Sequence, residues 1–110
     1  MIQDRIEKIE ATLKNAQNLS VETRQELLHL LAELKAEVAS LTATHREDAD
    51  SIARFADASV HEAVRSERKP EQAESALKGL SASVEGFEAS HPRLVEIVDR
   101  LAITLSNMGI

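Results

Sequence analysis

The amino-acid sequence predicts an all-α fold, an elongated antiparallel helical hairpin or bundle with coiled-coil character. Apolar residues recur at alternating steps of four and three along most of the chain, which is the spacing of a helical seam. Residues 21–68 contain neither proline nor glycine, the residues that most often interrupt a helix. Only two residues are aromatic, and the other large apolar side chains are mainly aliphatic. We therefore expect a single domain over residues 1–110, with about four helices, one of them very long.

The first element is a helix over about residues 2–17, with its apolar side chains on one face. These side chains form a regular seam of Ile2, Ile6, Ile9, Leu13 and Ala16. Ser20 is a suitable N-cap for the next helix, because serine is favoured at that position. Since the connection between the two helices is short, the first helix should fold back antiparallel on the second.

The second element is the long helix, over about residues 21–68. Its first half has a seam of Leu27, Leu31, Leu34, Val38 and Leu41. A strict continuation reaches the polar His45 and Asp48, whereas a four-residue stutter leads to a second apolar series. That series is Ala49, Ile52, Ala56, Val60 and Ala63, with Phe55 and Val64 beside it. We favour the stutter, which predicts a helix on the order of 70 Å long. The alternative is a break near Thr44–Asp48, where polar residues would cap a new helix.

The last two elements are helices over about residues 70–89 and 92–108, each beginning at a proline. The seam of the third helix is Ala73, Leu77, Leu80, Val84 and Phe87. The seam of the fourth is Leu94, Val98, Leu101, Leu105 and Met108. Gly79 and Gly86 predict the close approach of another helix, with a hinge or a ligand niche as the alternative. Gly109 resembles the glycine of a Schellman ending.

The expected packing leaves one apolar face without a neighbour. The third helix should return along the second half of the long helix, and the fourth along its first half, beside the first helix. One end would then hold only two helices and expose the face from Ile52 to Val64. Because exposed stripes of this size usually mark interfaces, we expect a homodimer or tetramer. The predicted interface is Leu27, Leu31, Leu34, Val38, Leu41, Ile52, Phe55, Ala56, Val60, Ala63 and Val64.

Composition and charge argue against several classes of function. The formal net charge of −6 is unfavourable for binding nucleic acid or anionic membranes. The absence of cysteine excludes disulfides and thiol catalysis. No apolar run approaches the roughly 20 residues of a membrane span, and the first residues do not resemble a signal peptide, so we expect a cytoplasmic protein. The cations in residues 65–69 suit a helix C-terminus, with a basic binding patch as the alternative.

The histidines are the residues most suited to metal binding or catalysis. His45 with Asp48, and Asp57 with His61, have spacings that place two ligands on one helix face. Neither pair has the third and fourth ligands of a zinc site. The alternative is a site between two subunits, in which His45 and Asp48 of both copies supply four ligands. We interpret these residues as a polar layer that fixes the register of the seam. We expect no metal site, no cofactor and no catalytic residue.

Two C-terminal segments resemble a known family. They are Phe87–Leu94, with the sequence FEASHPRL, and Leu105–Ile110, with the sequence LSNMGI. The leucine-rich stretch 19–41 is also similar. The family is a group of small bacterial proteins catalogued as domain of unknown function 4404. The resemblance implies an uncharacterised helical protein and supplies no catalytic residues.

Three classes of function remain, and none of them is an enzyme. The favoured one is a self-associating structural or adaptor protein whose seams bind further copies of the chain. The second is a regulatory module that binds the helix of a different protein in an apolar groove. The third is a carrier of a small ligand or a metal ion.

Overall fold

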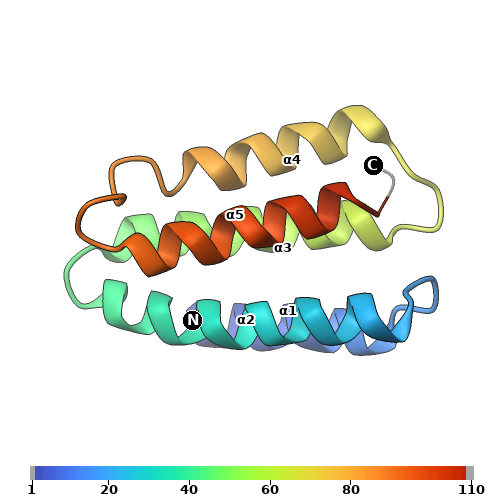
Figure 1. The fold of residues 1–110 in the computed structure, drawn as a ribbon, viewed down its shortest axis with the longest axis horizontal. Coiled ribbons are helices and arrows are strands. Elements are labelled where there is room, and N and C mark those ends of the chain that lie inside the picture. The colour runs from blue at the N-terminus through green and yellow to red at the C-terminus, as the bar shows by residue number, and fades with distance from the viewer. Residues whose placement is uncertain (1, 109–110) are drawn as a thin grey trace.

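Residues 2–108 are described by a computed structural model, in which α-helices follow one another along the chain (Figure 1). No strand occurs in this range, so the all-α prediction is confirmed. The predicted ending at Gly109 lies outside the described residues. Within residues 2–108 the helices are α1 (Ile2–Asn15), α2 (Val21–Thr42), α3 (Arg46–Val64), α4 (Pro70–Ala82) and α5 (Pro92–Ser106).

The helix predicted over residues 21–68 is divided, and this is the main correction to the predicted fold. The backbone N–H groups of Thr44 and His45 both donate to the carbonyl oxygen of Leu41, at 3.1 and 2.8 Å. These bonds close the last turn of α2. Residues 43–45 then turn the chain, so that α2 and α3 form an antiparallel hairpin (Figure 1).

The alternative interpretation, a break near Thr44–Asp48, is therefore correct, although the N-cap residue of the new helix makes no side-chain capping hydrogen bond. His45 occupies the N-cap position of α3, and its carbonyl oxygen accepts a hydrogen bond of 2.9 Å from Ala49 N. The first turn of α3 carries Glu47 and Asp48. Their negative charges are favourable at the positive end of the helix dipole, which stabilises a helix start at this point.

The division of the predicted long helix into α2 and α3 makes the molecule compact. The molecule measures 38 × 24 × 22 Å, and its radius of gyration is 12.9 Å, close to the ~13 Å of a compact domain of this size. An unbroken helix on the order of 70 Å would exceed this length and leave much of its apolar face in water. Folding α3 back on α2 buries that face within one chain. The prediction of an elongated molecule is wrong for this reason.

The helices pack in three tiers around α3. In Figure 1, α1 and α2 lie side by side, α3 and α5 form the next tier, and α4 is outermost. Helix α3 contacts all four other helices, and α2 contacts α1, α3 and α5. As predicted, α4 packs along α3 and α5 packs along α2. The expectation that the last helix lies beside the first is wrong, because no contact joins α1 and α5 in the described range.

Helix α1 is fixed to α2 at both its end and its middle. Ser20 caps α2 as predicted, with its Oγ accepting a hydrogen bond of 3.1 Å from Thr23 N. Arg24 Nε donates to the carbonyl oxygen of Leu13 at 3.1 Å, near the C-terminus of α1. Lys35 Nζ lies 2.6 Å from Glu7 Oε2, and this hydrogen bond raises the pKa of Lys35.

Helix α4 is shorter than the predicted 70–89. It ends at Ala82, and the chain turns through Gly86, whose φ of 96° suits glycine and disfavours other residues. Val84 and Phe87 still reach the core, so their burial was predicted correctly although they are not helical. The prediction that Gly86 permits a close helix contact is wrong, because a Cβ there would meet no atom within 4 Å.

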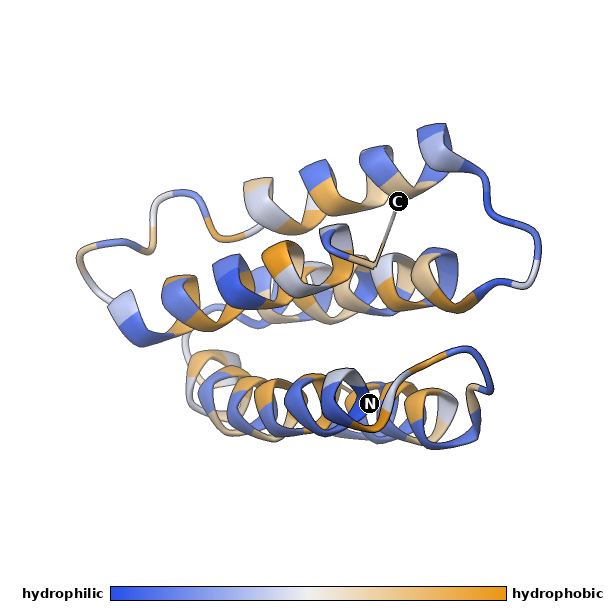
Figure 2. Ribbon diagram, turned by 45° about the vertical axis from the view of Figure 1, so that its right-hand side comes forward, coloured by the Kyte–Doolittle hydropathy of each residue, from blue (hydrophilic) through white to orange (hydrophobic). Residues whose placement is uncertain are grey.

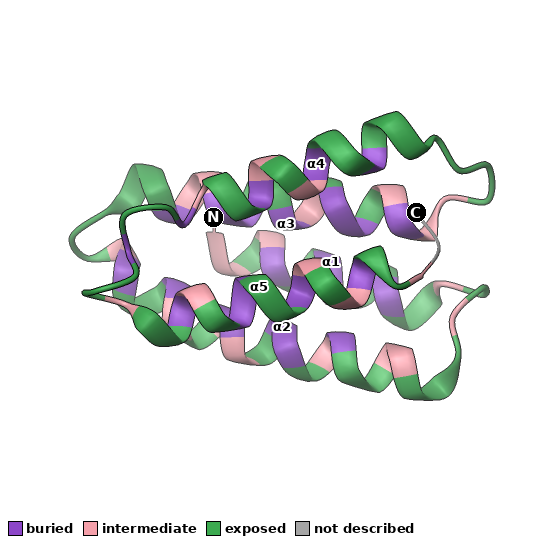
Figure 3. Cartoon of the chain, turned by 45° about the horizontal axis from the view of Figure 1, so that its top comes forward, coloured by how far each residue is buried: buried purple, intermediate pink, exposed green. Residues whose placement is uncertain are grey.

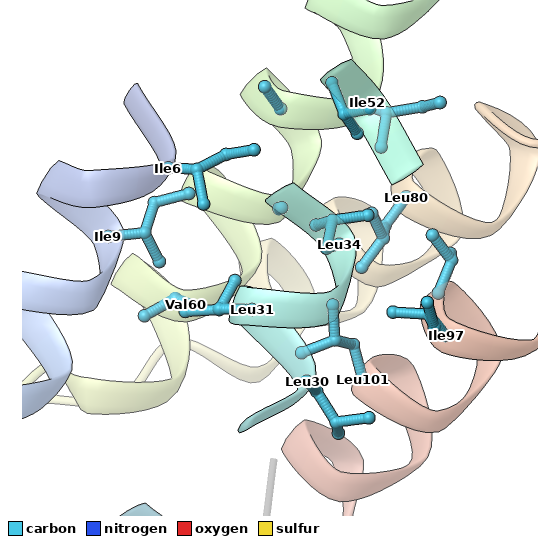
Figure 4. Close-up of a cluster of buried hydrophobic side chains, with 14 of the residues drawn as sticks. Ile6, Ile9, Leu30, Leu31, Leu34, Ile52, Val60, Leu80, Ile97 and Leu101 are labelled. Carbon is cyan, nitrogen blue, oxygen red and sulfur yellow. The ribbon is translucent and has the colours of Figure 1, made fainter. Parts of the chain in front are cut away.

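One continuous hydrophobic core joins all five helices. Apolar residues face inwards and polar residues outwards on each helix (Figure 2), and buried residues form stripes along them (Figure 3). Figure 4 shows the centre of this core, where buried side chains from every helix meet. The labelled residues are Ile6, Ile9, Leu30, Leu31, Leu34, Ile52, Val60, Leu80, Ile97 and Leu101.

The residues predicted to form an interface between chains lie mostly in this core. Val64 is half-buried and Phe55 is 39% exposed. All others of that set are buried within the single chain: Leu27, Leu31, Leu34, Val38, Leu41, Ile52, Ala56, Val60 and Ala63. The argument that this face needs a second chain does not hold, because the α2–α3 hairpin, α1 and α4 cover it.

Ser59 is the one polar residue that is fully buried within the described range. It lies on α3, and its hydroxyl has no hydrogen-bond partner among the described residues. A buried hydroxyl without a partner loses its hydration with no compensation, which destabilises the folded state.

We expect Ser59→Ala to raise the free energy of unfolding by about 1 kcal/mol, because it removes this hydroxyl and adds a better helix former. The midpoint of urea unfolding measures the change. Ser75→Ala is the matched control, since Ser75 is exposed on α4 and reports helix propensity alone. A lower midpoint for Ser59→Ala would show that the hydroxyl makes a stabilising hydrogen bond in solution.

Candidate functional site

A large open groove of about 1000 Å³ lies between α4 and α5. We call it the α4/α5 groove. The α4 side, with the turn that follows, contributes Pro70, Glu74, Leu77, Lys78, Ser81, Ala82 and Glu85. The α5 side contributes Ala102, Ile103, Ser106 and Asn107.

The groove follows from the way in which each helix uses its apolar stripe. Helix α4 directs Ala73, Ala76 and Leu80 into the protein, where α3 is its principal neighbour. Helix α5 directs its own stripe mainly towards α2. The two helices contact one another less closely, and the space between them therefore remains open to solvent.

The interior of the groove is apolar. Leu77 and Ala102 are half-buried, and Ile103 is 60% exposed. Isoleucine is among the residues that are most often buried in folded proteins, so this exposure is notable on a helix whose other large aliphatic residues are covered. The groove thus presents apolar surface that the chain itself does not cover.

The edge of the groove on α4 carries charges of both signs. Lys78 Nζ lies 3.1 Å from Glu74 Oε1, in an exposed i,i+4 pair. Glu85 follows one helical heptad after Lys78 and is also exposed. Exposed pairs of this kind contribute little to stability, so Lys78 can exchange its partner without a large cost.

At Gly79, α4 closely contacts a side chain of α3. A Cβ at this position would lie 2.3 Å from Phe55 Cε1, so the Phe55 ring covers the glycine. Gly79 thus permits close contact with the preceding helix, and the contact is made by the Phe55 side chain. The Phe55 ring occupies the space next to Gly79, where the alternative prediction placed a ligand niche.

Two of the histidines meet in an aromatic cluster at one end of the bundle. The ring centroid of His45 lies 5.3 Å from that of Phe87 and 6.3 Å from that of His91. Phe87 and His91 are 5.6 Å apart. The cluster joins the α2–α3 connection to the α4–α5 connection, and Thr44 Oγ1 lies 2.8 Å from His45 Nδ1. We attribute a packing role to it.

The carboxylates predicted to pair with His45 and His61 are Asp48 and Asp57. Asp57 accepts a hydrogen bond of 3.3 Å from Arg5 of α1. Asp48 lies in the first turn of α3 and is exposed. Within residues 2–108, no group of three or more His, Cys, Asp or Glu side chains is placed to hold a metal ion.

Sequence reasoning missed both the aromatic cluster and the groove. The i,i+4 spacing of Phe87 and His91 was a usable signal for the cluster, because such residues meet when the backbone turns helically. Ile103 was a signal for the groove, since it lies outside the predicted apolar seam of its helix. Leu77 was predicted as part of the seam of the third helix, and it is half-buried.

Within residues 2–108, no helix combines the length and apolar character needed to cross a bilayer.

Comparison with known proteins identifies the chain by family. No curated protein and no solved structure matched the chain. A family model described as "Domain of unknown function (DUF4404)" matches residues 29–110, which is more than half of the sequence. The chain therefore belongs to this family, as its C-terminal segments indicated.

Proposed function

We propose that this protein is a non-enzymatic interaction module that binds an amphipathic helix in the α4/α5 groove. The observation that carries the proposal is the apolar surface of the groove, above all Ile103, which is 60% exposed. Contiguous apolar surface without an internal partner usually marks a site of protein interaction. The protein is thus still proposed to be an interaction module. Its proposed binding surface lies on α4 and α5, whereas the sequence-based prediction placed it on residues of α2 and α3.

The dimensions of the groove suit a helix. Helix α4 has 13 residues and α5 has 15, so the walls are about 20 Å long. A helix of three to four turns has the same length and would place residues at i, i+3 or i+4, and i+7 along the floor. The open form of the groove is less suitable for a small molecule, because small-ligand sites bury most of the ligand surface.

The proposal predicts that a charge on the groove floor abolishes helix binding. Peptides selected from a helix-display library against the wild-type protein should bind the Ile103→Lys variant at least about tenfold more weakly, because a charge in an apolar contact is unfavourable. Fluorescence anisotropy with labelled peptide measures the dissociation constants.

Val21→Lys is the matched control, because Val21 is 63% exposed and lies at the start of α2, away from the groove. The selected peptides should bind this variant as tightly as the wild type. Failure to select any helix, or peptides that bind Ile103→Lys with unchanged affinity, would contradict the proposal.

A further inference from the structure

We propose that the helix bound in the α4/α5 groove is α4 of a second copy of this chain, in a two-fold symmetric dimer. The inference rests on the proposed function and names the partner for the same groove. It comes from the pattern of side chains on the exposed face of α4, which is complementary to itself when a second α4 lies antiparallel to it.

Four groove residues form one stripe on α4 and the turn that continues it. Lys78, Ser81, Ala82 and Glu85 follow the spacing i, i+3, i+4, i+7, and all four are exposed. Glu85 N donates to the carbonyl oxygen of Ala82 at 3.1 Å, an i to i−3 bond that forms a turn directly after α4. These positions therefore lie along one side of the helix.

A two-fold axis relates residues in reciprocal pairs: if residue i of one copy contacts residue j of the other, then j also contacts i. With Lys78 opposite Glu85 of the second copy, the antiparallel register places Ser81 opposite Ala82 of that copy. The same alignment thus forms two ion pairs and two contacts between small residues. Both kinds of contact arise at one register, which is the signature of a self-complementary surface.

The small residues lie where the two helices come closest. Ser81 and Ala82 flank the two-fold axis in this register, and their short side chains allow the helix backbones to approach. The charged residues are farther from the axis, where longer side chains can span the gap. Lys78 is available because its exposed pair with Glu74 contributes little.

The second copy also covers the apolar surface that the monomer exposes. A helix that lies in the groove contacts both walls, so it covers Leu77 on one side and Ile103 on the other. By symmetry, the same two residues of the second copy are covered at the same time. The net charge of −6 on each chain opposes association generally, so the pairing depends on the local match of Lys78 with Glu85.

A charge exchange tests the register. Lys78→Glu and Glu85→Lys each place like charges opposite one another twice in the dimer, whereas the double variant restores two opposite pairs with reversed polarity. Sedimentation velocity over a micromolar concentration series measures the mass, relative to 12.1 kDa for one chain. We expect a dimer for the wild type and the double variant, and at least about tenfold weaker dimers for each single variant. Unchanged thermal unfolding at low concentration shows that the exposed substitutions leave the fold intact.

The other outcomes overturn the inference in distinguishable ways. A wild-type protein that stays monomeric at every concentration rejects the second copy as the partner, while the selected peptides still test the groove. If neither the single charge substitutions nor Ile103→Lys changes the dimer dissociation constant, the dimer forms through another face. If Ile103→Lys weakens the dimer but the charge variants do not, the second copy binds in the groove in a different register. This outcome rejects the α4 pairing and leaves the proposed function in place.

Discussion

Replacing Leu34 with aspartate should leave the chain unfolded at every protein concentration. Leu34 is 0% exposed in the centre of the core, on α2, among side chains from the other helices (Figure 4). Truncating such a leucine to alanine already costs about 2–5 kcal/mol, and burying a carboxylate without a partner adds several more. The sum is comparable to the ~5–15 kcal/mol that stabilises a typical domain.

Far-UV circular dichroism and thermal unfolding measure this effect. Val21→Asp is the control, because the side chain of Val21 is exposed and the added charge suits the first turn of a helix. If Leu34 instead lay in an interface between chains, Leu34→Asp would give a folded, helical monomer. Cooperative melting of that variant near the wild-type temperature would therefore contradict the structure.

The second large effect concerns Gly79→Ala, whose effect on the free energy of unfolding should change sign when Phe55 is removed. In the wild type, Gly79→Ala should destabilise the protein by about 1–3 kcal/mol, because the new methyl group would overlap the Phe55 ring and displace it. In a Phe55→Ala background the ring is absent. The same substitution should then stabilise the protein by up to about 1 kcal/mol, because alanine is the better helix former.

Urea unfolding of the wild type, both single variants and the double variant gives the coupling energy between the two positions. Because the Phe55 side chain is partly exposed, its ring can move towards solvent without disrupting the core. We therefore expect all four proteins to fold. A stabilising effect of Gly79→Ala in both backgrounds would show that Phe55 does not cover the glycine in solution.

Local signals in the sequence predicted the helix starts well. Ser20 caps α2, and Pro70 and Pro92 begin α4 and α5, as the preferences of serine and proline indicated. The apolar spacing also identified most core positions. Each of these features depends on a few neighbouring residues, and such features are accessible from sequence alone.

The division of α2 from α3 was harder to predict for a physical reason. A four-residue offset in the apolar pattern is produced both by a stutter in a continuous helix and by a tight connection between two helices. What decides between them is the apolar area that is buried when Ile52 and Val60 fold back towards Leu31 and Leu34. No local pattern reports that long-range gain.

The same limitation explains the predicted interface. An apolar helix face has the same sequence pattern whether its own chain or a second chain covers it. If residues 21–68 form one helix, the face from Ile52 to Val64 has no partner in the chain, and a dimer follows. The groove depends instead on the spacing of α4 and α5, which follows from their packing against α3 and α2.

The hairpin that α2 and α3 form within one chain determines both the core and the position of the groove. Spin labels at Glu22 and Ser66, both exposed, mark the start of α2 and the chain just beyond α3. Double electron–electron resonance measures their separation, with unlabelled protein in excess so that pairs between copies do not contribute.

Figure 1 places the start of α2 and the end of α3 at the same end of the molecule, so we expect a distance well below the 38 Å length of the bundle. A continuous helix would separate them by about 66 Å at its usual rise per residue. A distance near that value would contradict the hairpin, the burial of the predicted interface residues, and the assignment of the interaction surface to α4 and α5.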